Sequence, residues 1–166
     1  MAVRRSAGLL LYRCAPPAAT DPGIEVLIGH MGGPLWARKE AGAWSIPKGE
    51  YGEDEEPLAA ARREFGEELG LPPPEGEPLD LGEVKQSGGK VVRVWAVEAD
   101  LDPAEVVPGT FTMIWPPRSG KQAQFPELDR VAWCPPAVAT ERLVAAQRAF
   151  VERLLAALGP PGAPIA

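Results

Sequence analysis

The chain has 166 residues, of which 45% are hydrophobic and 24% charged, which suits one globular domain with a sizeable core. Its net charge of −6 argues against nucleic acid as the main partner, because phosphate backbones are bound by basic surfaces. No apolar run is long enough to cross a bilayer, and no segment has the pattern of a signal peptide. The two cysteines, Cys14 and Cys134, give no disulfide framework. We therefore expect a cytoplasmic protein without a membrane partner.

The first part of the chain is predicted to be mostly strand. Residues 3–12 and 24–31 carry alternating or continuous apolar patterns and are expected to form a hairpin across the Pro- and Gly-rich segment between them. Residues 32–42 form a glycine-bounded loop in this interpretation. A short strand then follows over residues 43–47 and ends at Pro47.

Residues 56–70 are the clearest helix in the sequence. Pro57 suits the first turn, the alanines favour helix, and Gly70 is a typical C-terminal cap. The apolar stripe that would face the core consists of Leu58, Ala61, Phe65 and Leu69.

The second half is predicted to hold a hairpin, a strand and a closing helix. The hairpin spans residues 79–100 and turns at the SGG sequence, the strand spans 126–134, and an amphipathic helix spans 140–158. Its predicted core residues include Leu143, Phe150, Leu154 and Leu158. We therefore expect an α+β fold, with a mixed sheet between helices in one domain over residues 1–159 and a flexible tail over 160–166.

Three glutamates in the first predicted helix raise a question of function. Glu64, Glu67 and Glu68 stand at i, i+3 and i+4, so they lie on one helix face and repel one another. No lysine follows at the spacing that would neutralise them. The face is either solvated, as in many acidic helices, or it holds a divalent cation such as Mg²⁺, which prefers oxygen ligands.

The residues around these glutamates resemble the signature of the Nudix hydrolases. From Gly49 to Leu71 the sequence reads GEYGEDEEPLAAARREFGEELGL, which matches G-x5-E-x7-R-E-U-x-E-E-x-G-U at every fixed position, U being a bulky apolar residue. The predicted order of elements also resembles the α/β/α sandwich with a mixed sheet of this family.

The resemblance implies both a reaction and a set of site residues. Nudix enzymes use water and Mg²⁺ or Mn²⁺ to cleave a nucleoside diphosphate linked to another group, and homodimers are common among them. In this chain Arg63 would orient the glutamates through paired hydrogen bonds, assisted by Glu55 from the preceding loop. The implied metal ligands are the backbone carbonyl of Gly49 and the side chains of Glu64, Glu67 and Glu68, and the catalytic set includes Arg63, Glu64 and Glu67.

The entry to this motif, WSIPKGE from Trp44 to Glu50, gives a hint about substrate. It resembles the W-x-x-P-K-G entry of Nudix hydrolases that act on diadenosine polyphosphates, diphosphoinositol polyphosphates and some oxidised nucleoside triphosphates. Lys48 is therefore either a phosphate contact or an exposed loop lysine. Trp44 is expected in the core.

The general base is expected downstream, in the loop before the last strand. The resemblance places it within SGKQAQFPELDRVAW, where we favour Glu127. Gln124 is the alternative if that position only orients water or metal, and the more distant Glu105 is a weaker candidate for the base. Glu127 could equally be a surface turn residue after a proline. His30, the single histidine, is expected to be structural or exposed.

Two loops carry tryptophan next to basic residues and are candidates for substrate binding. Trp36 and Arg38 lie in the loop over residues 32–42, and Trp115 and Arg118 lie in IWPPRSGKQ. Together they would form an aromatic and basic rim for a nucleotide, although either tryptophan could be packing instead.

The sequence thus predicts a Mg²⁺- or Mn²⁺-dependent pyrophosphohydrolase in which water attacks phosphorus. Its substrates would be dinucleoside polyphosphates first and (oxidised) nucleoside triphosphates second. The alternative is a non-catalytic Nudix-like module that binds nucleotides as a sensor or regulator.

Overall fold

The computed structural model describes residues 3–15 and 23–159. Within these ranges it has nine strands and three α-helices. The predicted Pro- and Gly-rich hairpin loop lies largely outside the described residues, and so does the predicted tail over 160–166. No helix of the described ranges is long and apolar enough to span a bilayer.

Seven strands form one mixed sheet around the central strand β1. β1 and β6 are parallel and the other pairs are antiparallel. The sheet has the order β3-β2-β1-β6-β5, with β4 added to β1 and β9 to β2. Its strands are β1 (Arg5–Cys14), β2 (Ile24–Met31), β3 (Trp44–Ser45), β4 (Lys48–Glu50), β5 (Leu79–Lys85), β6 (Val91–Glu98) and β9 (Leu128–Cys134).

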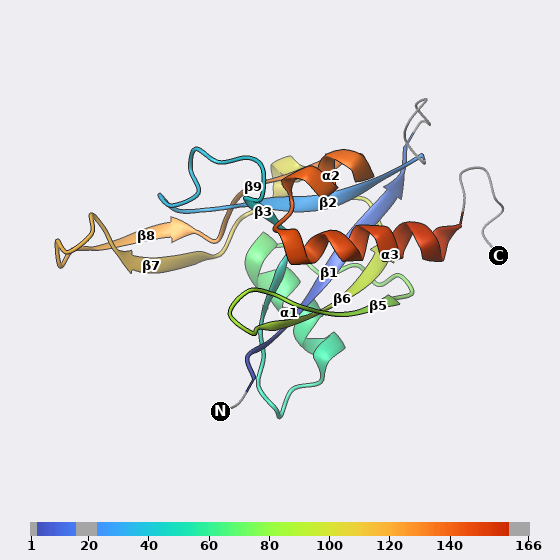
Figure 1. Ribbon diagram of the computed structural model, residues 1–166, viewed down its shortest axis with the longest axis horizontal. Helices are drawn as coiled ribbons and strands as arrows, with labels where there is room; N and C mark the ends of the chain where they lie inside the picture. The colour runs from blue at the N-terminus through green and yellow to red at the C-terminus, as the bar shows by residue number, and fades with distance from the viewer. Residues whose placement is uncertain (1–2, 16–22, 160–166) are drawn as a thin grey trace.

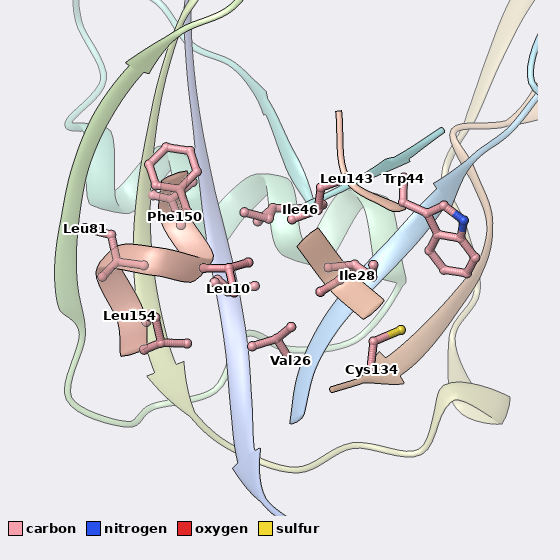
Figure 2. Packing of buried hydrophobic residues seen from close by; sticks show 14 of the residues in the cluster. Leu10, Val26, Ile28, Trp44, Ile46, Leu81, Cys134, Leu143, Phe150 and Leu154 are labelled. Carbon is pink, nitrogen blue, oxygen red and sulfur yellow. The ribbon is translucent and has the colours of Figure 1, made fainter. Parts of the chain in front are cut away.

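Helices cover both faces of this sheet, which confirms the predicted α/β/α sandwich. The helix α1 (Pro57–Leu69) packs on the face that carries Leu9 and Leu11 of β1. The helices α2 (Pro136–Arg142) and α3 (Arg148–Leu158) pack on the other face, as Figure 1 shows. Figure 2 shows Leu10 of β1 on that second face, close to Phe150 and Leu154 of α3. Alternation along β1 thus supplies apolar side chains to both layers.

The helix α1 begins and ends as the sequence predicts. Pro57 is its first residue, and Gly70 ends it in the left-handed conformation with φ 66°, its N–H donating to Gly66 O. An L-residue with a side chain would be strained there, so glycine suits the stop. The unexpected feature is that Glu64 and Glu68 are buried.

The closing helix is broken, so the prediction of one helix over residues 140–158 is wrong. α2 ends at Arg142, Leu143 and Val144 are extended, and the Val144 N–H donates to Trp44 O at 2.9 Å. A 3₁₀ turn, η2 (Ala145–Gln147), then leads into α3. The cause is Gln147, which is fully buried and whose Oε1 accepts from the Ile46 N–H at 2.8 Å. The predicted core residues Leu143, Phe150 and Leu154 are buried, whereas Leu158 is half-buried.

A separate two-stranded hairpin replaces part of the loop expected before the last strand. The strands β7 (Thr110–Ile114) and β8 (Gln122–Pro126) pair only with each other, and Figure 1 shows them projecting from the sandwich. We call residues 110–126 the β7–β8 arm. The pattern of half-buried Phe111 and Met113 between exposed Thr110, Thr112 and Ile114 has the two-residue period of a strand. This signal was available in the sequence.

Candidate active site

The guanidinium of Arg63 is the centre of the candidate site, because it holds three glutamates. Its Nε and Nη2 donate to the two carboxylate oxygens of Glu55, at 2.7 and 2.8 Å. Its Nη1 donates to Glu64 Oε1 at 2.9 Å and to both oxygens of Glu67 at 3.1 Å. The hydrogen bonds from Arg63 lower the pKa of the Glu55 carboxyl. The loop that carries Glu55 and the α1 residues Glu64 and Glu67 are thereby held in fixed positions relative to one another.

The carboxyl group of Glu64 occupies the space where a side chain at position 49 would be. An ideal Cβ built on Gly49 would lie 1.9 Å from Glu64 Oε2, so glycine is required for this close approach. Burial raises the pKa of Glu64, and the hydrogen bond from Arg63 only partly opposes this. The backbone of β4 and a buried carboxyl of α1 are therefore brought into direct contact.

Glu68 is the second buried carboxyl group of α1. Its Oε2 accepts a hydrogen bond from the Lys48 N–H at 3.1 Å. Burial raises the pKa of Glu68 to about 8; the charge of Lys48 lowers it and the charge of Glu127 raises it. The pKa values of Glu64 and Glu68 stay raised although the cations Arg63 and Lys48 act on them, because burial and the charge of Glu127 outweigh those cations.

These oxygens have the chemistry of a divalent-cation site, although they do not converge on one point here. Among residues 3–15 and 23–159, no three His, Cys, Asp or Glu side chains are placed to hold one metal ion together. Arg63 draws Glu64 and Glu67 towards itself, and Glu68 turns to the Lys48 N–H. The donor set fits a hard cation, since it consists only of oxygen and its buried members would be more stable with a positive charge beside them.

Lys48 is the first residue of β4, directly before Gly49, and its charge acts on Glu68. Its Cβ lies next to Gly8 of β1, where an added Cβ would come within 2.7 Å of it. Burial lowers the pKa of the Lys48 ammonium, and the charge of Lys90 lowers it further. Lys90, which precedes β6, was missed in the sequence because the SGGK segment indicated only a turn. Two neighbouring ammonium groups are a suitable contact for a phosphate group.

The candidates for the general base are placed in three different settings. Glu127 is exposed between β8 and β9, and its charge acts on Glu64 and Glu68. Gln124 lies exposed on the β7–β8 arm opposite Thr112, and Glu105 lies in the 3₁₀ turn η1 (Pro103–Glu105). Of these residues we favour Glu127, because its charge acts on both buried carboxyl groups of α1.

His30 is buried and holds the 32–42 loop against β9. Its Nδ1 faces the Asp129 carboxylate at 2.9 Å, and its Nε2 faces the Lys39 carbonyl at 2.7 Å. Both ring nitrogens are used in these contacts, which is a structural role.

The structure does not bring the predicted aromatic and basic rim together. Trp36 packs against the core on the α2–α3 face, with Lys39 Nζ 5.3 Å from its ring centroid, and Arg38 is exposed. Trp115 is half-buried and Arg118 exposed, at the tip of the β7–β8 arm. No contact between Trp36 and Trp115 is present in the part of the chain described.

The sequence matches the NUDIX domain family over residues 19–154. The chain therefore belongs to the Nudix family, whose members hydrolyse phosphoric anhydrides and generally use divalent cations. We call the Gly49 carbonyl and the carboxylates of Glu64, Glu67 and Glu68 the acidic centre; these are residues on which the sequence resembles the family signature.

Solved structures share the fold at low sequence identity. A C. elegans Ap4A hydrolase in a binary complex is 21% identical, with a TM-score of 0.62 and coverage of 92% of this chain and 95% of that chain. A MutT/nudix family protein from Listeria innocua is 16% identical, with a TM-score of 0.58 and coverage of 93% and 92%. The NUDIX domain of Shewanella oneidensis NrtR, complexed with ADP ribose, is 15% identical, with a TM-score of 0.58 and coverage of 93% and 87%. A search of curated proteins finds no match.

Replacing Arg63 by lysine is expected to lower kcat by about 10- to 100-fold, the usual cost of losing a partner that orients metal ligands. Lysine keeps the charge but cannot hold Glu55 with two parallel hydrogen bonds while also reaching Glu64 and Glu67. Steady-state kinetics on a cleaved nucleotide would measure the effect. Arg62→Lys, one residue away and outside this network, is the control and should stay within twofold of wild type. Equal activity of both variants would contradict the positioning role.

Proposed function

We propose that the protein is a Mg²⁺- or Mn²⁺-dependent pyrophosphohydrolase that cleaves the phosphoric anhydride of a nucleotide. Dinucleoside polyphosphates are the first substrate class and (oxidised) nucleoside triphosphates the second. The observation that carries this proposal is the arrangement around Arg63, which fixes Glu55, Glu64 and Glu67 next to the buried Glu68. A complete and ordered carboxylate set favours catalysis over the alternative, a nucleotide-binding module without activity.

The residues that would hold the cation are those of the acidic centre: the Gly49 carbonyl and the carboxylates of Glu64, Glu67 and Glu68. When bound, the cation would neutralise the anhydride and make an attacking water more acidic. Glu127 would accept the proton of that water, because its exposed carboxylate acts electrostatically on the same centre. Lys48 and Lys90 would bind phosphate oxygens, and water would attack phosphorus in line with the leaving group.

The order of substrates rests on the W-x-x-P-K-G entry that leads from Trp44 into β4. Lys48, the lysine of this entry, is paired with Lys90 in the fold, and two cations suit a chain of several phosphates. The Ap4A hydrolase from C. elegans shares this fold, which supports testing a dinucleoside polyphosphate first. Arg38, Arg118 and Trp36 remain candidate substrate contacts in this proposal.

A substrate screen with metal control tests the proposal. Purified protein would be incubated with diadenosine tetraphosphate, ATP and 8-oxo-dGTP in EDTA, Mg²⁺ or Mn²⁺, in ¹⁸O-labelled water, and products analysed by anion exchange and mass spectrometry. We expect cleavage of at least one compound with a cation, none in EDTA, and a single ¹⁸O in one phosphate product. Nucleotide binding without any cleavage would instead indicate the non-catalytic module.

A further inference from the structure

The β7–β8 arm starts and ends at the acidic centre. Gly109, just before β7, donates its N–H to Glu68 O at 3.3 Å, and a Cβ built there would be 2.6 Å from Glu67 O. Glu127, just after β8, donates its N–H to Gly109 O at 2.8 Å. The arm is therefore attached directly to the last turn of the helix that carries the candidate metal ligands.

One side of the arm is an aromatic face without support from the main sheet. Phe111 pairs with Phe125 and Met113 with Ala123, and the two phenylalanine ring centroids are 6.0 Å apart. A two-stranded hairpin alone is only marginally stable in water, so such a face needs a partner. We define the aromatic face as the half-buried side chains of Phe111, Met113, Trp115, Ala123 and Phe125.

The 32–42 loop covers only the root of this face. A Cβ on Gly33 would be 2.9 Å from Phe111 Cζ, and the Gly32 N–H donates to Glu127 O at 2.9 Å. Five residues of strand extend about 17 Å, so the face continues outward well beyond that contact. Figure 1 shows the arm reaching away from the sandwich at this point.

The charge of the arm points to an anionic ligand. Residues 110–126 contain Arg118 and Lys121 and no aspartate or glutamate, which is a charge of +2 in a chain of net charge −6. Both cations are exposed at the tip. These cations lie at the tip, away from the carboxylates that would hold a metal, so they would attract an anionic ligand to the arm without contacting its phosphates. The aromatic surface between tip and root suits stacking of a base.

We propose that the aromatic face of the β7–β8 arm binds the nucleobase of the substrate. This inference rests on the proposed function and extends it. The phosphates would lie at the acidic centre, and the base would lie along the arm on the side of Phe111 and Phe125.

The test compares ligands with and without a base. Isothermal titration calorimetry would measure the affinity of the protein for ADP and for pyrophosphate, both with Mg²⁺. The double substitution Phe125→Leu and Trp115→Leu should weaken ADP binding about tenfold, which is the usual effect of losing one stacked base. Pyrophosphate affinity should not change. The control Ile114→Ala, on the exposed face of β7, should leave both affinities unchanged.

Hydrogen exchange on the unmodified protein tests the same inference without depending on the folding of the variants. ADP should slow hydrogen exchange of the amides of residues 110–126 and pyrophosphate should not. Equal ADP affinity in the double variant, or no ADP-specific protection of the arm, would overturn the inference, as would a dimer that dissociates when the face is altered. Because these are binding measurements, they remain decisive even if the substrate screen finds no cleavage.

Discussion

Glu68→Gln is expected to lower kcat by roughly 10³-fold and at the same time to stabilise the metal-free protein. The substitution removes one carboxylate of the acidic centre, and the loss of several kcal/mol of charge stabilisation corresponds to a fall in kcat of roughly 10³-fold. It also removes a buried group that is costly to ionise, because burial raises the pKa of Glu68 from 4.5 to about 8. Activity and stability should therefore move in opposite directions.

The sign of the pH dependence follows from proton binding. Between pH 4.5 and about 8 the folded protein keeps the proton on Glu68 while the unfolded chain loses it, so the free energy of unfolding falls as pH rises. The stabilisation of Glu68→Gln over wild type should accordingly be small at pH 5 and on the order of 4 kcal/mol at pH 8. Urea denaturation in EDTA at the two pH values measures this difference.

Glu67→Gln is the matched control for this experiment. Glu67 belongs to the same signature, but its side chain is 58% exposed, so its replacement should lower turnover without a pH-dependent gain in stability. Added Mg²⁺ should stabilise wild type more at pH 8 than at pH 5 and should have little effect on Glu68→Gln. A Glu68→Gln enzyme with normal kcat would exclude metal ligation by that residue.

Local signals in the sequence were sufficient for the parts of the fold that depend on neighbouring residues. Pro57 and Gly70 define the ends of α1 because the first tolerates a missing N–H and the second a positive φ. The alternation in residues 91–97 predicts the two faces of β6, and its members Val94 and Trp95 are found in opposite core layers. The spacing of the signature glutamates likewise places them on one side of a helix.

Features that depend on residues distant in the sequence could not be predicted from local sequence patterns. The apolar period of residues 140–158 is compatible with a continuous helix, and the break depends on Gln147 reaching the backbone of Ile46 across the core. Lys90 becomes a candidate phosphate contact only because folding brings it close to Lys48. The burial of Glu64 and Glu68 is also a tertiary effect, since the helical spacing places them on one face but does not determine what covers that face.

Gly49→Ala is expected to lower kcat about 100-fold while changing the melting temperature little. The new methyl group would meet Glu64 Oε2 at 1.9 Å, so this carboxyl must move, and a displacement of about 1 Å in a catalytic group can cost about 100-fold in rate. The atoms it meets are at the end of a flexible side chain, so the backbone can stay in place. Kinetics and thermal unfolding of the same preparation measure the two effects.

Two other glycines make the Gly49→Ala result interpretable. At Gly52, just after β4, an added Cβ meets nothing within 4 Å, so Gly52→Ala should leave kcat unchanged. At Gly109 the added Cβ would lie 2.6 Å from the backbone oxygen of Glu67, which cannot rotate away, so Gly109→Ala should lower both kcat and the melting temperature. If Gly49→Ala instead unfolds the protein as Gly109→Ala does, Gly49 is required for the fold. A loss of activity in a stable protein would show that the close approach of β4 to Glu64 serves the site.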